Sequence, residues 1–206
     1  MNLYKKIFYN KKILIYGMGK TGFSSYKYLR KNNQIFLYDD NKNIFNKKIL
    51  KKLLLNKNKI HQSKFDFILI SPGININNCD LKNYLKKNLK KIITDLDIFY
   101  SNHSKNMIIT ITGTNGKSTT AKLLNLILKD HKKDSRLCGN IGNPILSQKK
   151  ISKKTLFVVE ASSYQIAYSK FFKTNYAVIL NISPDHLERH GSIENYVSAK
   201  FKLITN

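Results

Sequence analysis

Residues 110–119 read TITGTNGKST and connect an apolar run at 107–111 to a predicted helix. A glycine-rich turn between a buried strand and a helix presents backbone amides that can bind phosphate oxygens. In such a turn Lys117 can reach terminal phosphates, and the hydroxyl of Ser118 or Thr119 can bind Mg²⁺. The predicted phosphate-binding loop comprises Gly113, Thr114, Asn115, Gly116, Lys117, Ser118 and Thr119.

This loop departs from the common GxxxxGK[ST] pattern, because Ile111 stands where that pattern has its first glycine. The alternative is a structural turn that happens to contain a lysine. The buried strand before the loop and the helix after it favour phosphate binding.

The rest of the chain alternates short β-rich runs with helical stretches, which predicts βαβ units and parallel sheets in an α/β fold. Strands are expected at 12–16, 34–38, 65–70, 91–93, 107–111, 155–159 and 176–180, and helices at 21–31, 44–55, 81–88, 117–129 and from 193 onward. The polar stretch 101–106 separates two series of elements. We therefore expect one domain over 1–104 and a second over 105–206.

A second glycine motif, GMGKTG at 17–22, directly follows the first predicted strand. Its glycines allow a tight turn in which backbone amides approach a diphosphate. Asp39 ends the next strand, where a carboxylate could bond a ribose or a base. The motif does not identify the nucleotide, and a purely structural turn is the alternative.

Ionisable residues follow two later strands. Glu160 ends the strand at 155–159 and could bind Mg²⁺, or it could be a charge at a helix N-terminus where Ser162 acts as the cap. Several ionisable side chains gather at 185–190, and together with the phosphate loop they favour a site.

The composition gives 37 basic against 12 acidic residues, a net charge of +25, over 206 residues. Such a charge could attract nucleic acid or an anionic membrane. Only three of the basic residues are arginines, however, and the lysines are spread along a chain poor in Gly, Pro and Trp, which favours compositional drift. Two cysteines and the lack of a signal-peptide or membrane-spanning run favour a reducing compartment and no membrane insertion.

Three motifs taken together resemble the Mur ligases of peptidoglycan synthesis: TITGTNGKST at 110–119, EASSYQ at 160–165 and NISPDHLERH at 181–190. Tyr-Gln at 164–165 and SPGI at 71–74 are similar to the D-glutamate-adding branch. The resemblance implies a Rossmann-like first domain that binds a UDP-sugar, followed by a truncated P-loop-type ATPase domain.

The resemblance also implies the reaction. ATP phosphorylates UDP-N-acetylmuramoyl-L-alanine, and the amine of D-glutamate attacks the resulting acyl phosphate. The catalytic residues would be Lys117, His186 and Lys200, the last of them carbamylated. Two Mg²⁺ ions would be bound through Ser118, Glu160, His186 and Lys200. The UDP-substrate would contact Gly17, Gly19, Thr21, Gly22, Asp39, Ser71, Pro72, Gly73, Thr94, Asn140, Ser162 and Gln165.

Members of this family are about twice as long and have three domains. We therefore expect a fragment that lacks the C-terminal domain and does not ligate alone. The resemblance implies a monomeric enzyme of the cytoplasm that takes part in cell-wall biogenesis, cell shape and cell division. We expect no specific nucleic-acid partner. The alternatives are a Mur ligase that adds another amino acid, a non-catalytic nucleotide-binding remnant, a basic nucleic-acid-binding protein, or a nicotinamide-dependent dehydrogenase that would use only the 17–22 motif.

Overall fold

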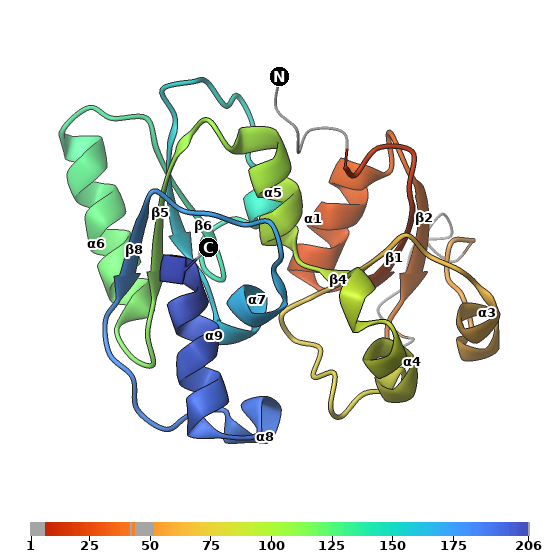
Figure 1. Ribbon diagram of the computed structural model, residues 1–206. Coiled ribbons are helices and arrows are strands. Elements are labelled where there is room, and N and C mark those ends of the chain that lie inside the picture. Colours follow the sequence, from red (N-terminus) through yellow and green to blue (C-terminus); the bar gives the residue numbers. More distant parts are fainter. Residues whose placement is uncertain (1–6, 42, 44–51, 206) are drawn as a thin grey trace.

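Two parallel sheets lie side by side, with helices packed against them (Figure 1). The computed structural model describes residues 7–41, 43 and 52–205. Runs such as 13–16 and 67–70 are apolar at consecutive positions because a parallel strand is covered on both faces. The predicted α/β class with parallel sheets is confirmed.

The first sheet has the strand order β2-β1-β3-β4. Its strands are β1 (Lys12–Tyr16), β2 (Gln34–Tyr38), β3 (Phe67–Ile70) and β4 (Ile92–Ile93), and its helices are α1 (Lys20–Leu29), α3 (Lys57–Gln62) and α4 (Lys82–Lys87), with a 3-10 turn at Leu89–Lys91. β1 pairs with β2 on one side and with β3 on the other. The winding direction therefore reverses at β1, and in sheets of this kind ligands bind beyond the carboxyl ends of the strands at the point of reversal.

The second sheet has the order β6-β7-β5-β8. Its strands are β5 (Met107–Thr112), β6 (Ser135–Gly139), β7 (Leu156–Glu160) and β8 (Tyr176–Ile179). The helices of this half are α6 (Lys117–Asp130), α7 (Ser163–Tyr168), α8 (Leu187–His190) and α9 (Ile193–Thr205), with a 3-10 turn at Ile145–Ser147. Because β5 lies between β7 and β8, the loops that follow these three strands meet at one edge.

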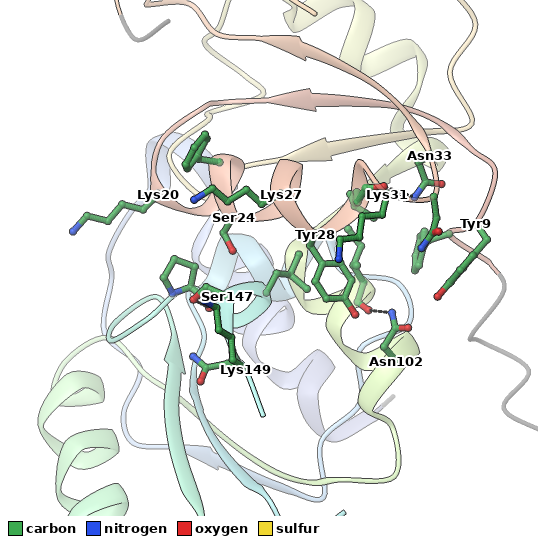
Figure 2. Close-up of a pocket in the computed structure, with 18 residues that line it drawn as sticks. Tyr9, Lys20, Ser24, Lys27, Tyr28, Lys31, Asn33, Asn102, Ser147 and Lys149 are labelled. Atoms are coloured by element: carbon green, nitrogen blue, oxygen red, sulfur yellow. Dashed lines mark hydrogen bonds between the residues drawn. The ribbon is translucent and has the colours of Figure 1, made fainter. Parts of the chain in front are cut away.

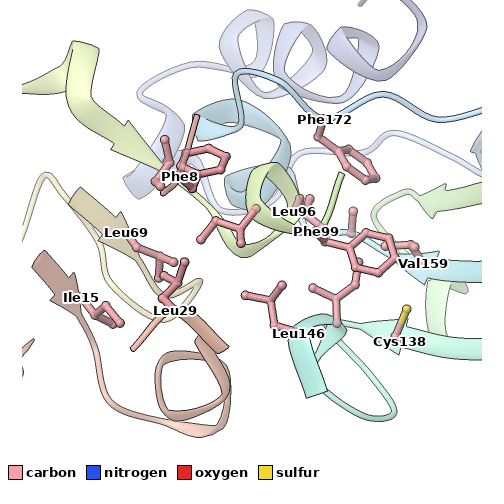
Figure 3. Close-up of a cluster of buried hydrophobic side chains, with 14 of the residues drawn as sticks. Phe8, Ile15, Leu29, Leu69, Leu96, Phe99, Cys138, Leu146, Val159 and Phe172 are labelled. Carbon is pink, nitrogen blue, oxygen red and sulfur yellow. The ribbon is translucent and has the colours of Figure 1, made fainter. Parts of the chain in front are cut away.

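Helix α5 (Asp95–His103) lies between the two sheets (Figure 1). A capping box formed by Thr94 and Asp97 fixes its start. Its residues join one apolar cluster that includes side chains from both sheets (Figure 3). The ring of Phe99, for example, meets that of Phe157 on β7 edge to face, with centroids 4.7 Å apart. The two sheets therefore share a continuous core.

The expected strands agree with the observed ones to within one or two residues. The helix expected over 44–55 lies mostly outside the described residues; Lys52–Leu55 form a turn and a short bridge to β2. Five elements were not among those expected: α3, α5, α7, α8 and β6. Each lacks a clear apolar pattern, since α5 buries two aspartates and α3 buries only Ile60.

No described helix combines the length and the apolar character that crossing a membrane requires.

Candidate functional site

The loop after β5 is fixed by glycines and by one asparagine. Gly116 has φ +79°, a conformation that side-chain-bearing residues rarely adopt, and it begins α6 without a side-chain cap. Asn181, which follows β8, accepts from the backbone amides of Thr114 and Asn115 at 3.2 and 2.9 Å and donates back to the carbonyl of Asn115. The first-turn amides of α6, which no side chain caps, are the ones that a helix N-terminus offers to an anion.

Two side chains at the start of α6 turn in different directions. Lys117 folds back on its own loop, where Nζ donates to the carbonyl of Thr114 at 2.6 Å. Ser118 Oγ donates to Glu160 Oε2 at 2.8 Å. The start of α6 therefore directs an ammonium group toward the loop and a hydroxyl toward the end of β7.

Glu160 ends β7 and is 1% exposed. Its carboxylate accepts from two neutral groups, Ser118 Oγ and, at 3.0 Å, Asn140 Nδ2. None of the ion pairs within the described residues includes this carboxylate. A buried carboxylate with only neutral partners is costly, and a hydroxyl and a carboxylate are oxygen ligands that suit Mg²⁺. The residues present therefore fit a magnesium ion.

Lys200 is not a surface lysine. It lies on α9 with 1% exposure, and its Nζ donates to the carbonyl of Gly113 at 2.8 Å and lies 4.5 Å from the ring centre of Tyr196. Burial, together with the charge of Lys117, lowers the pKa of Lys200 to about 8. This side chain is therefore held against the phosphate loop with part of its population neutral near neutral pH.

The loop after β8 brings two histidines to the same edge. His186 has a left-handed backbone, with φ +53°, and its ring lies near Asp185 and Glu188 at 3.3 and 3.7 Å. His190 contacts Ser163 Oγ at 2.9 Å. Burial, followed by the charge of Arg189, lowers the pKa of His190. Neither this loop nor any other part of the described residues contains a group of three or more His, Cys, Asp or Glu side chains arranged as metal ligands.

Arg189 joins this loop to the first sheet. Its guanidinium donates to the carbonyls of Pro72, at 3.0 Å, and Ile74, and it lies 3.6 Å from the ring centre of Tyr164. Asn77 donates to the backbone carbonyl of Arg189 at 3.1 Å. The loop after β3 and the loop after β8 are thus held together across the two halves of the chain.

A pocket of about 360 Å³ opens where these loops meet. It contains eight of the residues predicted for the site: Pro72, Gly73, Gly113, Lys117, Asn140, Ser162, His186 and Lys200. The remaining lining residues are Ser163, Tyr164, Asp185, Arg189 and Tyr196. The volume is in the range of small-molecule sites.

The residues predicted in the first glycine motif follow β1 at its carboxyl end. Gly17 has φ +92°, and Ser71 Oγ donates to its carbonyl at 2.6 Å. A Cβ on Gly22 would lie 1.8 Å from that same carbonyl oxygen, so only glycine lets α1 approach β1 this closely. Asp39 accepts from the amides of Met18 and Asn41 at 2.5 and 2.9 Å. The carboxylate therefore shapes the turn itself.

Four other residues predicted to bind the UDP-substrate make contacts within the protein itself. Gly19 is the N-cap of α1, and the carbonyl of Thr21 accepts from Ser25. Thr94 and Gln165 are 2% exposed, and Gln165 donates to Asp95 at 3.1 Å. Burial raises the pKa of Asp95 to about 6.

Ser162 caps α7 in a capping box with Gln165 and also reaches the pocket.

The sequence assigned no binding role to Asn181, Tyr164 or Tyr196, and it placed Arg189 only among the ionisable residues at 185–190. Asn181 and Arg189 lie within the quoted 181–190 motif, and their position after a buried strand was the available signal. Tyr196 donates to or accepts from Thr114 Oγ1 at 2.9 Å, a contact between residues 82 positions apart. A pattern in neighbouring residues of the sequence cannot predict a contact between residues so far apart.

Two family models match the chain. Residues 11–93 match the Mur ligase MurD-like N-terminal domain, and residues 111–206 match the Mur ligase middle domain. Among curated proteins, the UDP-N-acetylmuramoylalanine--D-glutamate ligase of Rickettsia bellii is 39% identical over 98% of this chain and 44% of that protein. The ligase of the same name from Rickettsia prowazekii is 37% identical over 98% of this chain and 45% of that protein. The chain thus spans less than half the length of these relatives.

Two solved structures share the fold. A UDP-N-acetylmuramate:L-alanyl-gamma-D-glutamyl-meso-diaminopimelate ligase from Neisseria meningitides aligns with a TM-score of 0.56 at 16% identity, over 95% of this chain and 68% of that one. A UDP-N-acetylmuramate-alanine ligase from Thermotoga maritima aligns with a TM-score of 0.51 at 21% identity, over 95% of this chain and 47% of that one.

Proposed function

The chain belongs to the Mur ligase family, and we propose that it forms the UDP-substrate and ATP-phosphate sites of a D-glutamate-adding ligase. In this proposal the complete protein joins D-glutamate to UDP-N-acetylmuramoyl-L-alanine, in the cytoplasm, as a step of peptidoglycan synthesis and so of cell-wall biogenesis and cell division. The names of the relatives support this amino acid over others. The observation that carries the proposal is the shared pocket, where the phosphate loop, Lys200 and the loop after β3 meet.

On the ATP side, we infer that the first-turn amides of α6 and Lys117 bind the β- and γ-phosphates. Lys117 now donates to a loop carbonyl, and a phosphate oxygen would replace that acceptor. Ser118 and Glu160 would hold Mg²⁺, with His186 and Lys200 near a second ion. Bound Mg²⁺ would neutralise charge that develops on the transferring phosphoryl group.

On the UDP side, the glycine turn at 17–22 and Ser71 would hold the diphosphate at the N-terminus of α1. Gly73, Asn140 and Ser162 reach the common pocket and would guide the muramoyl group toward the phosphate loop. The substrate carboxylate would then meet the γ-phosphate beside Lys117, which favours acyl phosphate formation through positioning. The amine of D-glutamate would attack the acyl carbon and release phosphate.

Lys200 would act as a carbamate. The ammonium group first loses one proton. The neutral amine then adds the carbon of CO₂ and loses a second proton, so that a cation becomes an anion beside the magnesium ligands. The lowered pKa and the enclosed position next to the carbonyl of Gly113 support this role.

The test of the ATP side uses ³¹P NMR of MgATP titrated with the 206-residue chain. We expect the β and γ signals to broaden and shift, and Lys117→Ala to weaken this effect at least about tenfold, because a charge-assisted phosphate contact is lost. Lys122→Ala is the matched control, since Lys122 is exposed on the same helix. Equal broadening by Lys117→Ala and the unchanged chain would contradict the assignment.

A further inference from the structure

A second cavity, of about 820 Å³, lies along the seam between α1 and the segment 144–149 (Figure 2). It shares no lining residue with the pocket at the phosphate loop. α5 contributes Ile98 and Asn102, and the chain before β1 contributes Phe8 and Tyr9. The cavity is therefore built from both halves of the chain, and it meets the proposed UDP site only at Lys20, the first residue of α1.

Two buried polar groups in its wall lack a partner. Ser24 is 8% exposed, and its Oγ makes no hydrogen bond within the described residues; the same holds for Gln148 Nε2. These are two of the three buried side-chain atoms of this kind in the described part of the chain. In Figure 2 Ser24 points from α1 into the cavity, toward the segment that carries Ser147 and Lys149. Buried donors without acceptors are costly, so a ligand oxygen that accepts from either of them would be stabilised here.

All of the charged side chains that line the cavity are positive. Lys20, Ser24, Lys27 and Lys31 follow one another at spacings of four, three and four residues, which places them on one face of α1 and its extension. Lys149 lies on the opposite wall, and none of the lining residues is acidic. Four lysines are unremarkable in so basic a chain. Their positive charge favours a negatively charged ligand. The unpartnered Ser24 and Gln148 indicate where its charged group would bind.

The rest of the wall is apolar. Leu29 and Leu146 face each other across the seam and belong to the shared core, and the ring of Tyr28 also lines the space. Sites for small molecules of this volume combine apolar walls with a few polar groups that fix orientation.

We propose that this seam cavity binds a small organic anion with an apolar body, such as an aryl or alkyl carboxylate. An oxygen of the anionic group accepts from Ser24 Oγ and Gln148 Nε2, Lys27 and Lys149 balance its charge, and the apolar body packs against Leu29 and Leu146. The ligand touches both halves of the chain, so it would bind most tightly to this arrangement of the two sheets.

The test uses 4-phenylbutyrate as the anionic probe and 4-phenylbutyramide as its neutral counterpart. The side-chain amide of Gln148 is followed by ¹H–¹⁵N NMR and assigned from its loss in Gln148→Leu. We expect a saturable shift of this signal with the carboxylate and affinity at least about tenfold weaker for the neutral amide. Inorganic phosphate should also bind at least about tenfold more weakly, because it lacks the apolar body.

Substitutions of the lining residues test whether the anion binds in the seam cavity. Ser24→Ala should weaken 4-phenylbutyrate binding at least about fivefold, and Lys149→Gln should weaken it in a salt-dependent way. Ser25→Ala is the matched control, because that serine is buried on the same helix but donates to the carbonyl of Thr21 and does not line the cavity. Lys122→Gln controls for loss of charge.

An unmoved Gln148 signal, equal affinity for the neutral amide, or unchanged binding by Ser24→Ala would each overturn the proposal. Each result is independent of the ligase assignment, since none of these residues lines the pocket at the phosphate loop.

Discussion

Burial gives one lysine of this chain a pKa well below that of an ordinary lysine. Lys200 is one of 34 lysines, yet it is enclosed against Gly113 and Tyr196, and its pKa is lowered to about 8. Only a neutral amine reacts with CO₂. With this pKa, about one Lys200 amine in ten is neutral at pH 7, against roughly one in 2,500 for an ordinary lysine.

We therefore expect Lys200 to form a carbamate as the pH rises through about 8, well below the range of the surface lysines. A ¹³C signal from labelled CO₂ should appear over this range at a fixed concentration of dissolved CO₂. It should be absent in Lys200→Met and retained in Lys122→Met. A signal of equal intensity in Lys200→Met, or one that appears only above pH 10, would contradict the assignment.

At the scale of elements, the two sheets are joined by short contacts between loops. α8 is only four residues long, yet Arg189 at its end contacts the carbonyls of Pro72 and Ile74 and the ring of Tyr164. Charged hydrogen bonds of this kind contribute about 1.5–3 kcal/mol each when partly buried.

We expect Arg189→Met to lower the free energy of unfolding by about 1–3 kcal/mol and to speed amide exchange in the loops after β3 and β8 together. Urea denaturation and hydrogen exchange measure the two effects. Arg30→Met is the control, because its exposed guanidinium lies near Tyr26 within the first half. Faster exchange in only one of the two loops would show that Arg189 does not join them.

The sequence pattern predicted the elements whose apolar residues follow a clear period, including β1, β5 and α6. It did not predict α5, because Asp95 and Asp97 are buried there and look like surface residues in the sequence. Asp97 is held by the backbone amides of Thr94 and of 170–172, more than 70 positions away. In the site, the glycines and Lys117 were visible as a motif, whereas the contact of Tyr196 with Thr114 depends on tertiary structure.

At the scale of the molecule, the chain has two sheets that share one apolar cluster, and the cavity at the phosphate loop is separate from the larger cavity along α1. The division into domains at 1–104 and 105–206 stays a prediction, as does the inability of these residues to ligate alone. The net charge of +25 is spread along the chain, and the proposed substrates are small anions bound by loop amides and a few side chains.

The central claim is that the first sheet binds a UDP-sugar and delivers it toward the phosphate loop. Calorimetric titration of the 206-residue chain with UDP-N-acetylmuramoyl-L-alanine tests it most directly, with NADH as the competing nucleotide. We predict saturable binding of one UDP-substrate per chain that NADH does not displace. Tight binding of NADH together with no measurable heat from the UDP-substrate would contradict the claim and favour a dehydrogenase-type site.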